Sequence, residues 1–86
     1  MIVKKTLIKR VIGNDTILVP VGKTVFESNG LFAINELGSF IWDLLPNVET
    51  EEEICRAVLE EYDVSEEEAA KDIHEFLGRL REMGIL

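Results

Sequence analysis

The chain has little of the residue types from which most catalytic and metal sites are built. Its 86 residues include a single cysteine, Cys55, and a single histidine, His74. One cysteine cannot form a disulfide within the chain, and it offers no pair of soft ligands to a metal ion. The two could in principle form a nucleophile and its base, but a small apolar residue on one helix and a histidine at the rim of another is the simpler interpretation. We expect no catalytic residues, no metal site and no cofactor.

Motifs for nucleotide binding, acyl transfer and membrane insertion are also missing. Four glycines at positions 13, 22, 30 and 38 stand alone and match no phosphate-binding spacing. There is no nucleophile elbow and no paired-cysteine signature. No apolar run approaches the ~20 residues that span a bilayer, and the N-terminus has no apolar segment followed by a cleavage site. These absences predict a cytoplasmic protein that is not an enzyme and does not contact a membrane.

Basic residues are scarce in the second half of the chain. Residues 1–35 have five basic and two acidic side chains, a net charge of +3, whereas residues 36–86 have four basic and fifteen acidic, a net charge of −11. The glutamates at 51–53 and 66–68 fall where first helical turns are expected, and the helix dipole favours them there. So acidic a second half argues against binding a phosphate backbone, and we expect no nucleic-acid partner.

The first third of the chain predicts strands. Residues 6–12 and 16–21 are rich in β-branched side chains and flank a Gly-Asn-Asp turn at 13–15, which indicates a hairpin. Pro20 cannot donate a ladder hydrogen bond and suits a strand end or an edge. A second turn signal at 28–30 precedes a short apolar segment, 31–34, which we predict as the third strand. Residues 24–27 could extend either neighbouring element.

The rest of the chain predicts three helices. Asn35 is suited to be an N-cap, and apolar residues then recur at helical spacing until Pro46. Thr50 and Ser65, each followed three residues later by a glutamate, form capping boxes that open the second and third helices. Gly84 is placed to end the last helix. Strands followed by helices predict one α+β domain over residues 1–86, with the helices on one face of a three-stranded antiparallel sheet.

Two features could serve a partner. An open three-stranded sheet has two edges, and an edge can accept an extended peptide as an added strand. The apolar stripe of the last helix is roughly 140° wide, more than the ~100° needed to face a core. Its surplus, Ala70 and Leu77, lies between His74 and Arg81 and would form a shallow apolar groove with a polar rim. A protected edge and a surplus that packs on another helix are the alternative interpretations.

One segment resembles a known family. Residues 29–45 contain a short strand ending in an aliphatic-Asn pair, Ile34-Asn35, then Gly38, then an aliphatic-Trp-x-aliphatic-Leu run at 41–45. This pattern is similar to that of the PqqD-like proteins, in which leucine is usual where Ile34 stands. Residues 50–54, 60–65 and 76–86 resemble the family's second-helix start, its tyrosine-containing link and its ending. The resemblance therefore covers essentially the whole chain.

The resemblance implies a fold of three strands followed by three helices, a winged-helix-like arrangement. It also implies a recognition element that binds the leader of a ribosomally synthesised precursor peptide and presents it to a modifying enzyme, often a radical S-adenosylmethionine protein. The leader would add as a strand beside the third strand and lie against the third helix. Carried over by position, the peptide-binding candidates are Leu31, Phe32, Ala33, Ile34, Ala70, Ile73, His74, Leu77 and Arg81.

Some choices stay open at this point. Phe32 and Ile34 share one strand face and Leu31 and Ala33 the other, and the pattern does not decide which face lines the peptide pocket. Arg81 and the N-terminal lysines could pair with acidic leader residues. The alternative functions are a winged-helix DNA-binding protein, which the acidic last helix disfavours, and a general adaptor or a homodimer formed through a strand edge.

Overall fold

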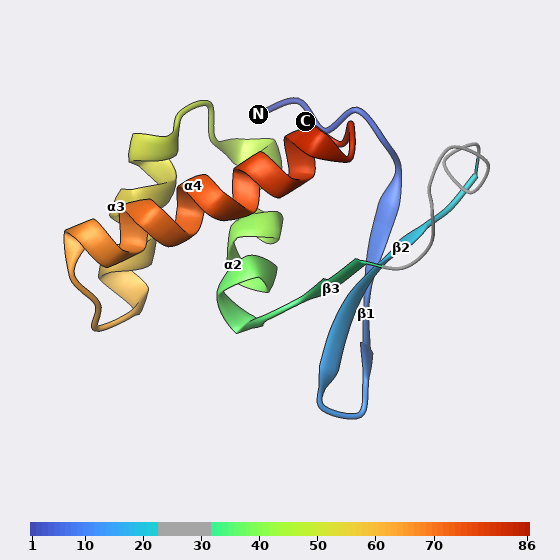
Figure 1. Cartoon of the computed structure of the whole chain (residues 1–86), viewed down its shortest axis with the longest axis horizontal. Coiled ribbons are helices and arrows are strands. Elements are labelled where there is room, and N and C mark those ends of the chain that lie inside the picture. The colour runs from blue at the N-terminus through green and yellow to red at the C-terminus, as the bar shows by residue number, and fades with distance from the viewer. Residues whose placement is uncertain (23–31) are drawn as a thin grey trace.

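The computed structural model describes residues 1–22 and 32–86, and its elements follow the predicted order. They are β1 (Leu7–Ile12), β2 (Asp15–Pro20), β3 (Phe32–Ile34), α2 (Glu36–Leu44), the 3-10 turn η1 (Leu45–Asn47), α3 (Glu51–Glu61) and α4 (Glu66–Glu82). Three strands followed by three α-helices confirm the predicted α+β arrangement. Leu31, the turn signal at 28–30 and the segment 24–27 lie outside the described residues. In Figure 1 the helices gather on one side, and α4 crosses in front of α2.

The three strands form an antiparallel sheet in the order β1-β2-β3. The hairpin turns through Gly13, whose φ of 63° is a left-handed conformation that glycine adopts without steric cost. Leu18 of β2 is opposite Phe32 of β3, and both side chains are buried. Because side chains alternate across a strand, Ala33 points to the opposite face of the sheet. Phe32 and Ile34 therefore face the core, and Ala33 does not.

The core lies between the inner face of the sheet and the apolar stripes of the three helices. Its fully buried side chains come from every layer: Leu18, Ile41, Leu45, Ile54, Val58, Ile73, Leu77, Leu80 and Ile85. Each such side chain contributes about 1.5–3 kcal/mol through its removal from water. The predicted helix starts are confirmed, since Asn35, Thr50 and Ser65 each accept a hydrogen bond from the backbone N–H three residues later. These caps fix where each stripe begins.

The two ends of the chain lie side by side, as Figure 1 shows. The N–H of Lys4 donates to the carbonyl of Ile85 at 2.6 Å, and the amino group of Met1 donates to the carbonyls of Leu45 and Val48. Gly84, with a φ of 73°, follows the end of α4 as predicted. These contacts tie the segment that leads into β1 to the C-terminal end of α4 and to the residues that follow α2. In the part of the chain that the structure describes, no helix combines the length and apolar character needed to cross a bilayer.

Candidate functional site

Strand β3 forms one edge of the sheet. It pairs with β2 on one side through Ile17 and Ala33 and their neighbours, and among residues 1–22 and 32–86 no strand pairs with its other side. An edge strand presents backbone N–H and C=O groups without partners, which makes it a template for another extended chain. The predicted open edge is therefore present at β3, and its surroundings decide what could use it.

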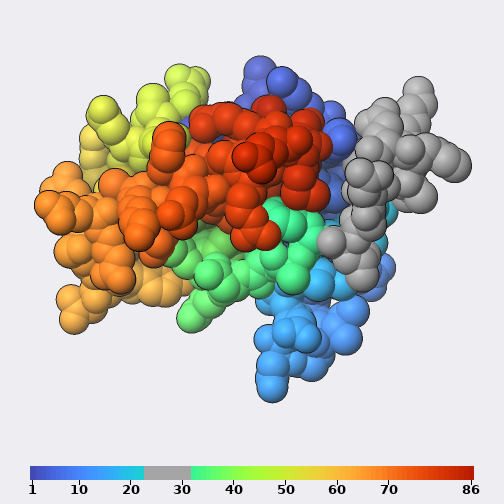
Figure 2. All heavy atoms as spheres, viewed as in Figure 1, coloured from blue at the N-terminus to red at the C-terminus, as the bar shows by residue number. Residues whose placement is uncertain are grey.

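An open cleft of about 710 Å³ runs along this edge. Three parts of the chain line it: the tip of the β1–β2 hairpin, the segment from Ala33 to Gly38 together with Ile41 of α2, and one face of α4. The α4 residues are Asp72, Glu75, Phe76 and Arg79. In Figure 2 the green residues that begin α2 lie between α4 above and the blue hairpin below. The free edge of β3 thus opens into a concave site with a helix as one wall.

Aromatic stacking fixes one end of the cleft. The rings of Phe32 and Phe76 are nearly parallel, with an interplanar angle of 12° and centres 6.4 Å apart. The guanidinium carbon of Arg79 lies 4.6 Å from the centre of the Phe32 ring. A cation over an aromatic face contributes about 0.5–1 kcal/mol at exposed positions. Both rings are largely buried, so the stack joins β3 to α4 and places a positive charge beside the strand.

The Asn-Gly motif of the sequence explains how β3 and α4 come close. The side-chain oxygen of Asn35 accepts a hydrogen bond from the N–H of Gly38 at 2.7 Å, which caps α2 directly after the strand. A β-carbon on Gly38 would lie 3.1 Å from the Phe76 ring, 3.2 Å from the Asn35 oxygen and 3.3 Å from Ile34. Glycine therefore provides the space in which Phe76 packs against the end of β3. The motif builds one wall of the cleft.

The exposed residues that the sequence proposed on α4 lie away from this cleft. Nδ1 of His74 is 3.5 Å from a carboxylate oxygen of Glu51, and a guanidinium nitrogen of Arg81 is 3.6 Å from the same oxygen. Glu51 is the first residue of α3. Ala70 lines a second, smaller hollow together with Cys55 of α3. The structure brings these α4 residues together with α3, and not with β3.

The predicted groove at Leu77 is corrected by the structure. Leu77 is 0% exposed and Ile73 is 1% exposed, and both belong to the core. The wide stripe has a structural cause, because α4 packs against α3 on one side and against α2 on the other. Two flanking partners require a broader apolar face than one partner does. Leu77 therefore has no surface that it could offer to a ligand in this conformation.

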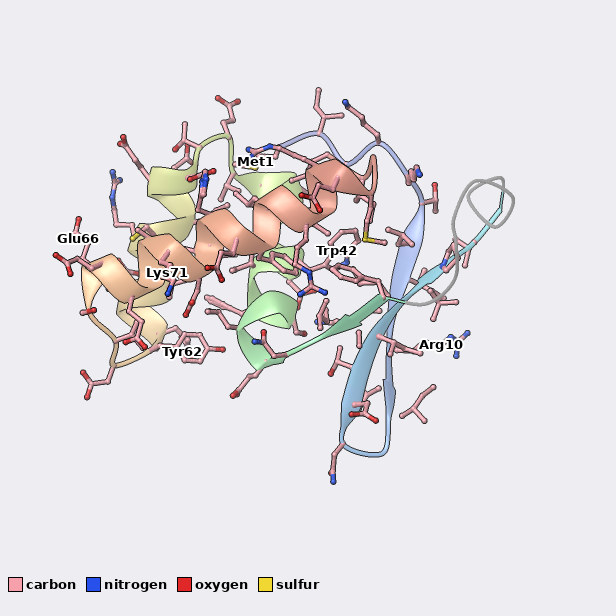
Figure 3. All side chains as sticks on the ribbon, viewed as in Figure 1. Met1, Arg10, Trp42, Tyr62, Glu66 and Lys71 are labelled. Carbon is pink, nitrogen blue, oxygen red and sulfur yellow. The ribbon has the colours of Figure 1, made fainter. Side chains whose placement is uncertain are left out.

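Charges and polar contacts near the cleft come from α2 and α4. Glu36 lies at the start of α2 and lines the cleft. Together with partial burial, which is the larger cause, the carboxylates of Glu36 and Glu61 raise the pKa of the Tyr62 phenol above its ordinary value. Tyr62 also meets the edge of Phe40, with ring centres 5.4 Å apart, and Figure 3 shows it beneath α4. Among the described residues, no group of three His, Cys, Asp or Glu side chains is placed to hold a metal ion.

The sequence reasoning missed the α4 residues that do face β3. Asp72, Glu75 and Arg79 recur at intervals of three and four residues around Phe76, so the sequence does place them on one helix face. Which of the two faces flanking the apolar stripe lies beside the sheet depends on how the helices pack. The one signal available was Phe76 itself, an aromatic residue on the flank that carries Arg79.

Comparisons with known proteins identify a matching family and a similar solved structure. A family model described as "Coenzyme PQQ synthesis protein D (PqqD)" matches residues 16–86, which include the whole cleft except the hairpin tip. A search of curated proteins finds no match. A solved structure described as "TbiB1 in Complex with the TbiA(beta) Leader Peptide" is similar, with a TM-score of 0.74 and 27% identity. The likeness covers 100% of this chain and 94% of that one.

Proposed function

This chain belongs to the PqqD family, and from that premise we propose that it is a non-catalytic recognition element for the leader of a ribosomally synthesised precursor peptide. The structure of TbiB1, which contains a leader peptide, supports the proposal because its likeness covers the full length of this chain. Such a precursor is made in the cytoplasm, and the proposal places this chain there. Binding a leader needs an exposed, shaped surface and no reactive group.

We propose that the leader binds by strand addition at β3. The observation that carries this is the position of the free edge, which opens into the cleft beside α4. Main-chain hydrogen bonds to the edge would supply affinity largely independent of sequence, and the side chains of the wall would select among peptides. A leader held in this way lies along the free edge of β3, in the cleft that α4 borders.

The helix side of the proposed site is the α4 face of Asp72, Glu75, Phe76 and Arg79. An extended chain added to β3 meets these side chains directly, since they line the same cleft as Ala33 and Ile34. The sequence-derived alternative, with Ala70, His74 and Arg81, requires a peptide that reaches the α3 side of the helix. Each alternative includes one arginine of α4, Arg79 in the first and Arg81 in the second, and the two lie two residues apart.

Recognition without catalysis is useful only if a second protein acts on the captured precursor. Strand addition immobilises the leader and leaves the rest of the precursor free, so the chain would present that free part to a modifying enzyme. The family resemblance favours an enzyme of the radical S-adenosylmethionine type. In this arrangement the outer surface of the domain, away from the cleft, remains available to the enzyme.

The decisive experiment titrates the precursor leader encoded beside this gene into the protein, with calorimetry and amide chemical shifts as readouts. We expect micromolar or tighter binding, with shifts at residues 32–35 and 72–79. A proline placed in the docking segment should abolish binding, because it removes a donor that the added strand needs. If the leader leaves the amide chemical shifts of β3 unchanged, strand addition at β3 is contradicted.

Two matched substitutions separate the two faces of α4. Arg79→Glu and Arg81→Glu change the charge by the same amount at exposed positions of one helix. We expect Arg79→Glu to weaken leader binding and Arg81→Glu to leave it nearly unchanged, whereas the α3-side alternative predicts the reverse. Light scattering of the free protein across concentrations provides the control. A homodimer formed through β3 would compete with the leader and lower its apparent affinity as protein concentration rises.

A further inference from the structure

The cleft beside β3 is charged differently at its two ends. Arg79 lies over Phe32, the first residue of β3. Asp72 is seven residues earlier on α4, about 10 Å away along the helix axis. Glu36 follows the last residue of β3 by two positions. Asp15 precedes Thr16, the partner of Ile34 in the sheet, and therefore lies at that same end. One end of the cleft is basic and the other is acidic.

In the part of the chain that the structure describes, the acidic side chains of the cleft form no ion pair. Within residues 1–22 and 32–86, the ion pairs join Lys9 to Asp43, and Glu51 to both His74 and Arg81. Asp15, Glu36, Asp72 and Glu75 are exposed and form none of these pairs, although all four line the cleft. Their mutual repulsion is relieved when a cation enters from outside.

The dimensions of the cleft limit the spacing of a complementary peptide. An extended chain advances about 3.3 Å per residue, and every second side chain points the same way. Side chains at positions i and i+4 therefore lie on one face about 13 Å apart, and the long, flexible side chains of arginine and lysine span the difference from the ~10 Å between the two ends of the cleft. Position i+2 lies between them and faces Phe76. Phe76 lines the cleft at that point, with its ring stacked on Phe32 and 8% of the residue exposed as an apolar contact. The wall thus presents an acidic, an apolar and a basic contact in order.

We propose that the cleft selects leader segments with the pattern basic-x-apolar-x-acidic. The basic residue lies between Asp72 and Glu36, the apolar residue lies on Phe76, and the acidic residue pairs with Arg79. An added strand that runs antiparallel to β3 continues the pattern of this sheet and forms the more stable type of pair. The basic residue then comes first in the leader sequence. This assignment rests on the proposed function, since it concerns the same bound peptide.

The test uses two synthetic peptides of identical composition, acetyl-Thr-Lys-Thr-Leu-Thr-Glu-Thr-amide and its isomer with Lys and Glu exchanged. Both are neutral, so general attraction to a chain with a net charge of −8 is the same for each. We expect the Lys-first peptide to bind about three- to tenfold more tightly, the range for two exposed ion pairs. The ratio should fall towards one in 0.5 M salt, which screens exposed charges.

Substitutions assign the effect to the two ends of the cleft. Arg79→Glu and Asp72→Lys should each remove most of the preference for the Lys-first peptide. Arg56→Glu, an equal change of charge on α3 outside the cleft, should retain it. Equal affinity for the two peptides, or no shift at β3 from either at millimolar concentration, overturns the charge assignment. The proposed function has a separate test: it is overturned if the leader encoded beside this gene also leaves the amide chemical shifts of β3 unchanged.

Discussion

Replacing Leu77 by alanine separates a core position from a binding position. The Leu77 side chain is 0% exposed and belongs to the core formed by the sheet and helices. Leucine-to-alanine changes at such sites lower the free energy of unfolding by about 2–5 kcal/mol, through lost burial and the cavity that remains. A domain of 86 residues has a total stability of about 4–13 kcal/mol. The substitution therefore removes a large part of the free energy of unfolding of the domain.

The expected change in melting temperature follows from the size of the domain. One kcal/mol corresponds to about 4–8 °C for domains of 60–100 residues, so a loss of about 3 kcal/mol lowers Tm by roughly 12–24 °C. Thermal and urea unfolding followed by circular dichroism at 222 nm measure this loss. Leu59→Ala is the matched control, because Leu59 is 38% exposed on α3 and its truncation leaves less of a cavity.

Leader binding supplies the second readout for Leu77→Ala. At a temperature where the variant is fully folded, we expect its affinity for the leader to remain within about twofold of the parent, because a core side chain makes no contact with the peptide. The reasoning is refuted if Leu77→Ala melts within a few degrees of Leu59→Ala and also loses leader affinity. That pair of results would place Leu77 on a binding surface and not in the core.

Three further predictions concern packing, a cap and pH. Gly38→Ala should lower the free energy of unfolding by about 1 kcal/mol in urea titrations, because its β-carbon would lie 3.1 Å from Phe76. Gly78→Ala, with nothing within 4 Å, should raise it by about 0.5–1 kcal/mol. Ser65→Ala should cost about 1 kcal/mol, since Ser65 caps α4. The pKa of Tyr62 is raised in the folded protein. The contribution of its protonated phenol to the free energy of unfolding is therefore fully present below the unfolded pKa of about 10 and is lost as pH rises through the folded pKa. Between about pH 9 and pH 11, the Tm of the Tyr62→Phe variant should therefore fall less than the Tm of the parent protein.

The arrangement of the elements could be predicted because its signals are local. Each helix begins at a residue whose side chain caps it within three positions, as Asn35, Thr50 and Ser65 do. The hairpin turns at a glycine flanked by β-branched runs, and β1 and β2 pair in the register that this turn sets. The family pattern of Ile34-Asn35 and Gly38 is also visible in the sequence, because it consists of neighbouring residues that cap one helix. Capping and close approach involve residues within four positions of each other, apart from Phe76.

The face of α4 that borders the cleft could not be predicted in the same way. Helical periodicity shows that Leu77 and Phe76 lie on one broad apolar stripe, but it does not show which flank is covered by a neighbouring helix. The answer depends on α3, which packs on α4 and pairs Glu51 with His74 and Arg81. Those contacts turn the Ala70 flank towards α3 and the Arg79 flank towards the sheet. The information lies in the packing of three helices, and not in the periodicity of one.

The acidic character of α4 has two physical origins that a charge count combines. The glutamates at 66–68 occupy the first turn, where the helix dipole stabilises them, and Figure 3 shows Glu66 at the end of α4 far from the sheet. Asp72 and Glu75 instead line the cleft beside β3. Only this second group can influence what binds at the strand edge. The charge that argues against a phosphate backbone is therefore, at the cleft, also a reason to expect a peptide with a cation at one defined position.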